Sequence, residues 1–160
     1  MAHTAHRNIT KKRKGQVLSK VRELLKSASP KGEYIESVGR RKTATARVRM
    51  YPAKDNQMVV NGLDAKEYFK TERLAGIARA ALDDPEVGGT YHVSVMVRGS
   101  GMNAQAEAIR LGVSRAMVAE NEETRPYLKH KGFLKRDPRS VERKKFGLLK
   151  ARKAPTWVKR

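Results

Sequence analysis

The sequence predicts an α+β fold with a small mixed sheet of about four strands, helices packed on one face of that sheet, and an extended basic arm at each end. Three observations lead to this prediction. Segments in which apolar residues alternate with polar ones lie between segments in which apolar residues recur at helical spacing. The net charge of +20 is concentrated near the two ends of the 160 residues. Beyond residue 146 no periodic apolar pattern remains.

The two ends carry the positive charge, and the middle is nearly neutral. Residues 1–33 hold nine Lys or Arg and two Asp or Glu, residues 34–124 hold thirteen and twelve, and residues 125–160 hold fourteen and two. A block of like charge repels itself and attracts a polyanion, most commonly nucleic acid. We therefore divide the chain into a basic N-terminal extension (1–33), a compact core domain (34–132) and an extended basic C-terminal tail (133–160).

The predicted strands lie in the core domain. In the clearest of them, residues 43–51, the side chains alternate, so that one face of the strand is apolar and the other is basic. The apolar face consists of Ala44, Ala46, Val48 and Met50, and the other face of Thr43, Thr45, Arg47, Arg49 and Tyr51. The remaining strands are expected at 34–38, where Gly39 breaks the strand, at 57–60 and at 91–97.

Helices are predicted before, between and after these strands. An amphipathic helix at 16–28 has an apolar stripe with no evident partner in the core. Asp64 and Glu67 have the capping-box spacing of a short helix. Further helices are predicted at 71–82, 104–119 and 121–130, the last ended by Gly132, with one more turn at 140–145. From residue 146 the tail is predicted to be extended.

A basic cluster lies in the bend between the first two strands. Arg40, Arg41 and Lys42 occupy this bend, next to Arg47 and Arg49 of the basic strand face. Cations at a turn suit phosphate contact, and arginine also forks onto phosphate and stacks on bases. The alternative is a strand face that is only solvated.

A glycine-rich turn precedes the longest helix. Gly99, Ser100 and Gly101 allow a ligand to approach the backbone, and the start of the helix presents free N–H groups to an anion. Three interpretations stay open: a tight strand-to-helix turn, a contact with an RNA phosphate, or a site for a free nucleotide. The last has the least support, because neither a P-loop nor a complete dinucleotide motif follows.

The sequence gives little support for catalysis. Cysteine is absent, and none of the four histidines is spaced for a metal site or a catalytic triad. Asp83-Asp84 is interpreted as a helix-ending loop. We therefore expect no enzymatic activity, cofactor, metal or small-molecule substrate. Trp157, the one tryptophan, is either solvated or packed on a partner by stacking on a base or entering an apolar pocket.

The sequence gives partial information on the cellular location of the protein. No apolar run approaches the roughly 18 residues that span a bilayer, and the N-terminus has no hydrophobic signal core. We expect neither a membrane association nor secretion. The basic, acid-poor start also fits an organelle transit peptide, so the cytoplasm and an organelle remain alternatives.

Several motif blocks follow one another in a recognisable order. They are Gly39-Arg40-Arg41-Lys42 continuing to residue 48, and then 60–62 with 68–69, 99–110, 112–116, 137–139, 142–145, 147 and 150–153. This order resembles ribosomal protein nine of the small subunit, bacterial type, over residues 34–160. The resemblance implies a domain of the kind shared with the second domain of ribosomal protein five.

The same resemblance implies a structural role in the small ribosomal subunit during translation. It implies binding to rRNA in the head of the subunit, contact with neighbouring head proteins, and a tail that reaches the tRNA in the peptidyl site. Lys159 and Arg160 would approach that tRNA. The residues assigned to rRNA are Arg40, Arg41, Lys42, Arg47, Arg49, Gly99, Ser100, Gly101, Gln105, Arg110, Arg115, Arg136, Arg139, Arg143, Lys144, Lys145, Lys150, Arg152, Lys153 and Trp157.

The chain departs from the family pattern in two places. Ser100 replaces the middle glycine of a run of three, so a backbone angle suited to glycine is expected to be strained there. Val158 replaces a hydroxyl residue before the final Lys-Arg. The runner-up function is a non-ribosomal, non-specific nucleic-acid-binding protein or RNA chaperone, and a small nucleotide-using enzyme is a third.

Overall fold

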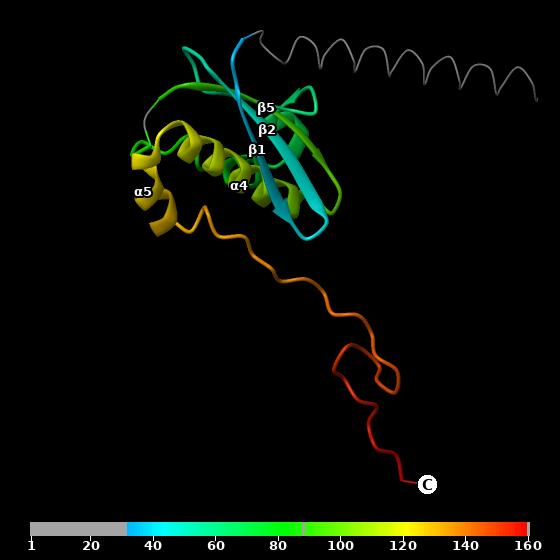
Figure 1. The fold of residues 1–160 in the computed structure, drawn as a ribbon. Helices are drawn as coiled ribbons and strands as arrows, with labels where there is room; N and C mark the ends of the chain where they lie inside the picture. Colours follow the sequence, from blue (N-terminus) through cyan, green and yellow to red (C-terminus); the bar gives the residue numbers. More distant parts are fainter. Residues whose placement is uncertain (1–31, 88, 160) are drawn as a thin grey trace, which may run out of the picture.

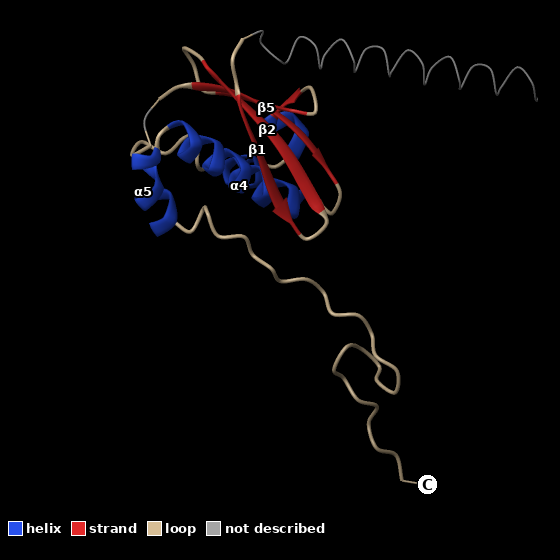
Figure 2. Ribbon diagram, viewed as in Figure 1, coloured by secondary structure: helices blue, strands red, loops and turns tan. Residues whose placement is uncertain are grey.

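A computed structural model describes residues 32–87 and 89–159, and it has the predicted α+β architecture with a mixed sheet (Figures 1 and 2). The sheet has five strands in the order β1-β2-β5-β3-β4. They are β1 (Ile35–Arg41), β2 (Ala44–Pro52), β3 (Gln57–Val60), β4 (Leu63–Asp64) and β5 (Tyr91–Arg98). The β3–β5 pair is parallel and the other neighbouring pairs are antiparallel.

The helices connect and cover these strands. They are α2 (Ala65–Phe69), α3 (Glu72–Arg79), α4 (Met102–Glu120), the 3-10 helix η1 (Glu122–Thr124) and α5 (Arg125–His130). The longest, α4, lies along one face of the sheet beneath β1 and β2, with α3 against it (Figure 1). None of the described helices is long and apolar enough to cross a membrane.

The core lies between α4 and the sheet. The inward residues of β2 are the predicted Ala44, Ala46, Val48 and Met50, all at most 1% exposed. They meet Val93, Val95 and Val97 of β5 across the register and Ala108, Ile109 and Val113 of α4 in the same cluster. The prediction of one apolar and one polar face for this strand is confirmed. Tyr51, expected on the polar face, is nevertheless buried, and its ring lies 5.4 Å from that of Tyr34.

Strand β1 packs directly on α4 through two glycines. A Cβ on Gly39 would lie 1.8 Å from the Ala108 carbonyl oxygen, and a Cβ on Gly112 would lie 2.6 Å from Val48 Cγ2. The Ser37 hydroxyl donates to the Gly112 carbonyl at 2.6 Å. The expectation that Gly39 breaks the strand was therefore wrong, because this glycine continues β1 and provides room for the helix backbone.

Other differences from the sequence prediction are local. The two-residue strand β4 was not expected, helix α3 ends at Arg79 rather than at 82, and the helix predicted at 121–130 is divided into η1 and α5. The turn predicted at 140–145 is absent, although Asp137 accepts from the Arg139 backbone N–H at 2.9 Å as a capping residue would. The amphipathic helix predicted at 16–28 lies outside the described residues.

The glycine contact gives the first prediction. Gly39→Ala should lower the free energy of unfolding by about 2–3 kcal/mol, because the new methyl group forces β1 away from α4. Gly76 is the matched control, since it lies in the middle of α3 with open space around its Cα. Gly76→Ala should raise stability by about 0.5–1 kcal/mol through helix propensity. Urea unfolding measures both, and equal effects of the two substitutions would refute the packing argument.

Candidate RNA interface

The sheet face opposite α4 is basic. The strand register places Arg40 beside Thr45, Thr45 beside Arg98, and Arg47 beside Met96 on this face. The Arg47 side chain is 55% exposed, and Met96 is 51% exposed. Cationic groups thus surround an accessible apolar side chain, and this combination suits a ligand with both phosphates and bases.

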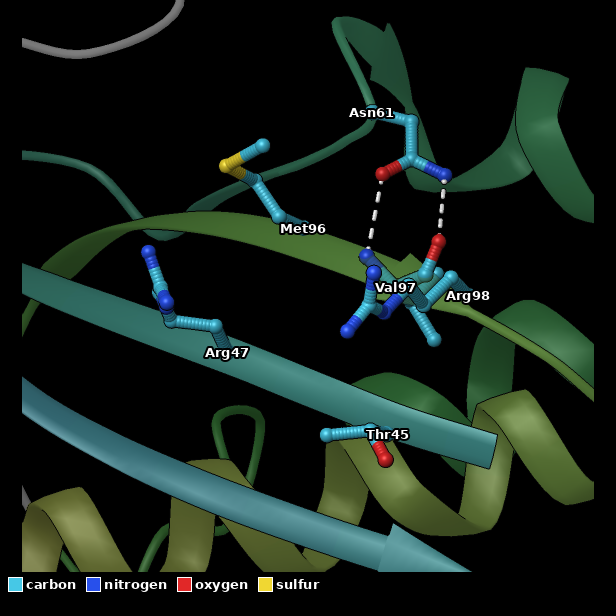
Figure 3. A pocket seen from close by; sticks show the side chains of 6 residues that line it. All are labelled: Thr45, Arg47, Asn61, Met96, Val97 and Arg98. Carbon is cyan, nitrogen blue, oxygen red and sulfur yellow. Dashed lines mark hydrogen bonds between the residues drawn. The ribbon is translucent and has the colours of Figure 1, made fainter. Parts of the chain in front are cut away.

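A hollow of about 280 Å³ lies on this basic face (Figure 3). Its lining residues are Thr45, Arg47, Asn61, Met96, Val97 and Arg98. Asn61 closes one side, since its amide both donates to the Val97 carbonyl and accepts from the Val97 N–H, each at 3.0 Å. These bonds hold the β3–β4 turn against β5 and so shape the hollow.

One carboxylate moderates the charge of this face. Glu36 on β1 accepts from Arg49 at 3.0 Å and lies 3.5 Å from Arg47. The hydrogen bond to Glu36 raises the pKa of Arg49 above its usual value, and the Arg49 guanidinium also lies 4.9 Å from the centre of the Tyr34 ring. Within the described residues no ion pair involves Arg40 or Arg98, so the face keeps a net positive charge.

Arg41 lies on the opposite side of the sheet from Arg40. Its side chain is only 11% exposed and contacts Glu107 of α4 at 2.5 Å and Asp137 at 2.7 Å. It also donates to the backbone carbonyls of Asp137 and Arg139 at 3.2 and 2.6 Å. Arg41 therefore fastens β1, α4 and the first residues of the tail together. The contact of Arg41 with rRNA stays a prediction. In the protein itself, Arg41 links β1 and α4 to the tail.

The α4 residues assigned to rRNA lie in different surroundings. Arg115 is exposed and donates to the Val38 carbonyl of the edge strand β1 at 2.7 Å. The Arg110 guanidinium lies 4.9 Å from the centre of the Phe133 ring. Gln105 is 8% exposed, and both ends of its amide are bonded, to the Gly99 carbonyl at 3.0 Å and to the Tyr68 hydroxyl at 2.9 Å.

The glycine-rich stretch forms a tight strand-to-helix turn. Gly99 has a φ of 86°, and a Cβ there would lie 2.4 Å from the Thr43 carbonyl oxygen. Ser100 has a φ of 53°, so the expected strain at this position is present. Gly101 is the N-cap of α4 and supplies no side-chain cap. The geometry matches the structural interpretation of the turn, and contact with RNA stays a prediction.

The tail from 133 to 159 contains no helix or strand and extends away from the core (Figures 1 and 2). Phe146 is 95% exposed and Trp157 is 80% exposed. A bidentate pair of Arg152 with Glu142, at 2.7 and 3.1 Å, closes a small loop within the tail. The tail cations assigned to rRNA are all exposed: Arg136, Arg139, Arg143, Lys144, Lys145, Lys150, Arg152 and Lys153. Lys159 is also exposed, and Arg160 lies outside the described residues.

Sequence reasoning missed Arg98, Met96 and Asn61 as parts of this face. The signal for the first two was present, because the valines of 91–97 define an inward face and leave Met96 and Arg98 outward. Asn61 gave only a turn signal, since its contact with Val97 spans 36 residues of sequence.

The acidic residues that follow α3 are paired with basic side chains. Asp83 pairs with Arg79 at 3.0 Å and Asp84 with Lys131 at 2.8 Å, and both lie in the loop after α3, which already ends at Arg79. Burial lowers the pKa of His92 below its usual value. Over residues 32–87 and 89–159, no cluster of His, Cys, Asp or Glu could hold a metal ion.

A compact α+β domain with one basic sheet face and a long exposed basic tail is the architecture of a nucleic-acid-binding protein. The pattern of the ribosomal protein S9/S16 family matches residues 39–160. The chain is similar to the small ribosomal subunit protein uS9 of Cytophaga hutchinsonii, with 47% identity over 128 residues that cover 80% of this chain and 99% of that one. It is also similar to the protein of the same name from Nostoc punctiforme, with 46% identity over 123 residues, 76% of this chain and 88% of that one. The chain therefore belongs to the S9/S16 family of ribosomal proteins.

The contact between Arg41 and Asp137 should depend on pH. Hydrogen bonds from Arg139, together with the charges of Arg139 and Arg41, lower the pKa of Asp137 from 3.8 to about 2. Because its pKa is lowered, the ionised Asp137 carboxylate stabilises the attachment of the tail root at pH values above about 4. This stabilisation is lost as the pH falls from about 4 to 2 and the carboxylate becomes protonated. We expect the protection of the backbone amides in 133–139, measured as exchange relative to the intrinsic rate at each pH, to fall over this range. Asp137→Asn should make this protection low at every pH, and an unchanged protection profile would contradict the assignment.

Ser100 offers a second test. Ser100→Gly should raise the free energy of unfolding by about 0.5–1 kcal/mol, because glycine adopts a positive φ without strain and this gain exceeds its entropic cost. Gly101→Ala is the neighbouring control, since Gly101 has a φ of −102° and open space around it. Thermal unfolding compares the two, and a loss of stability for Ser100→Gly would show that the serine side chain is needed.

Proposed function

We propose that this protein is a structural constituent of the small ribosomal subunit that binds rRNA through the basic sheet face and the tail. The observation that carries the proposal is the exposed basic tail fastened to the core by Arg41, in a chain that belongs to a ribosomal protein family. Beyond the tail root, the aromatic side chains of Phe146 and Trp157 are 95% and 80% exposed and have no packing in the described chain. Such a segment orders on a partner, and its cations select a polyanion.

The core and the tail would contribute differently. The core presents a rigid surface in which Arg40, Arg47 and Arg98 are spaced by the strands. The tail supplies charge, and the release of counterions as its cations meet phosphates favours binding at low salt. Residues 34–132 would thus position the protein on rRNA, and residues 133–160 would extend through it. Trp157 would stack on a base or enter an apolar pocket of a neighbour.

The end of the tail would reach the tRNA in the peptidyl site. Lys159 and Arg160 lie beyond Pro155 and Trp157, separated from the cations at 143–153. The cations at 143–153 would bind rRNA, and Lys159 and Arg160 would contact the tRNA. Neighbouring head proteins complete the surroundings, and the protein would reside in the ribosome of a bacterial cytoplasm. We propose no catalytic activity for it.

Two truncations test these assignments. Deletion of 143–160 removes eight Lys or Arg while keeping every helix and strand of the described core. We expect the core to stay folded, rRNA to bind more weakly, and the plot of log K against log salt to flatten. If half of these cations meet phosphates, the slope falls by about 3 units.

Deletion of 154–160 is the matched variant. It removes only Lys159 and Arg160 among the cations, so it should leave the slope for rRNA almost unchanged and weaken tRNA binding to assembled small subunits. Filter binding at several salt concentrations measures the first effect and tRNA retention the second. An unchanged slope after deletion of 143–160 would refute the role of the tail in rRNA binding.

A further inference from the structure

A hollow of about 420 Å³ lies between α4 and the root of the tail, residues 133–139. It is lined by Arg110, Gly132, Lys135, Asp137, Pro138 and Arg139. A second hollow of about 20 Å³ shares Arg110, Lys135 and Asp137 with it. We call the two together the tail-root hollow. It lies apart from the hollow on the basic sheet face, with which it has no lining residue in common.

The tail-root hollow has many more cations than carboxylates. Its basic lining residues are Arg40, Arg41, Arg110, Lys135, Arg136 and Arg139, and its acidic ones are Glu107 and Asp137. Arg41 binds both carboxylates, and Arg139 binds Asp137 as well at 2.9 Å. Within the described chain no ion pair reaches Arg110, Lys135 or Arg136. The surplus of positive charge is therefore not neutralised by the protein.

Arg110 is held in place without an acceptor. Its guanidinium lies over the Phe133 ring at 4.9 Å, and its buried Nε has no hydrogen-bond partner among the described residues. A buried donor without an acceptor costs free energy, and more so when it belongs to a charged group. A guanidinium stacked on a ring keeps the donors along its edge for an anion.

We propose that the tail-root hollow binds a phosphate group, and that this group is a backbone phosphate of the RNA. Arg110 would contact it from α4 and Lys135 from the tail root, with Arg136 and Arg40 at the rim. The RNA identity rests on the proposed function, whereas the affinity for phosphate rests on the geometry alone. Phosphate fits better than a carboxylate because several cations converge from different sides and it offers more acceptor oxygens.

Such a phosphate would couple the core to the tail. Arg41 already fastens the tail root to β1 and α4 through Asp137. A phosphate bound between Arg110 and Lys135 would add a second attachment on the other side of the same segment. The direction in which the tail leaves the core would then be fixed by the RNA as well as by the protein.

The first test uses inorganic phosphate and the full chain. The Arg110 Nε–H and the backbone N–H of Phe133 and Lys135 are followed by NMR as phosphate is added, with chloride at equal ionic strength as the reference. We expect saturable shifts at these three groups and none at Arg73, an exposed arginine on α3. Shifts that do not saturate, or that chloride reproduces, would overturn the proposal.

The second test uses small-subunit rRNA and four variants. Arg110→Met keeps an unbranched, mostly apolar side chain next to Phe133 and removes the guanidinium with its charge, Lys135→Gln alters an exposed side chain, and Arg110→Lys restores a cation. Each of the first two should weaken binding about tenfold or more and lower the salt slope by about 0.7, whereas Arg110→Lys should recover part of both. Arg73→Gln, the matched control, should change neither.

The outcomes separate the site from the function. If Arg110→Met and Lys135→Gln behave like Arg73→Gln while deletion of 143–160 still flattens the slope, the tail-root site on RNA is refuted and the proposed function stands. If the wild type binds phosphate but not rRNA, the site is confirmed as a free-phosphate site and the proposed function is refuted. Circular dichroism shows whether Arg110→Met keeps the fold. If this variant does not fold, the rRNA affinity of Lys135→Gln decides whether the tail-root hollow binds RNA.

Discussion

The close approach of β1 to α4 is the constraint on which the rest of the structure depends. It requires a glycine on each side, since a methyl group at Gly39 or Gly112 would overlap backbone or core atoms. Once the two elements are in contact, Arg41 at the end of β1 lies against Glu107, about one and a half turns before Gly112 on α4. The position of this arginine then determines where the tail root attaches. The packing of β1 against α4 thus determines where the basic tail begins on the surface of the core.

The arginines of this chain perform two physically different tasks. Arg41 and Arg115 bind backbone carbonyls, and Arg41 also neutralises two carboxylates, so they stabilise the protein itself. Arg40, Arg47 and Arg98 project from the sheet with little or no compensation. The alternation of a strand separates the two groups, because Arg40 and Arg41 are neighbours in sequence and lie on opposite faces. Cation-rich composition alone therefore overstates the number of groups that are free to meet a polyanion.

Much of this arrangement could be predicted from the sequence, and the rest depends on contacts across long separations. The alternation in 43–51 correctly predicted both faces of β2 except at Tyr51, because a strand with one buried face requires it. The break at Gly39 was wrong, since only the position of α4, more than 60 residues later, shows why a glycine is needed inside β1. The bonds of Arg41 to 137 and 139 span 96 and 98 residues, and no local pattern could reveal them. The short β4 likewise depends on its pairing with β3.

The attachment of the tail explains how one chain can combine a rigid surface with an extended segment. A basic tail without an anchor would search a large volume, and its ordering on RNA would lose all of that conformational entropy. The contacts of Arg41 with 137 and 139 fix the first residues in advance and leave only the remainder to be ordered. Because those contacts also place Lys135 beside Arg110 of α4, the same anchor that limits the entropy loss assembles a cationic hollow where core and tail meet. A phosphate bound in this hollow, as proposed, would therefore depend on a contact whose first effect is on the protein's own fold.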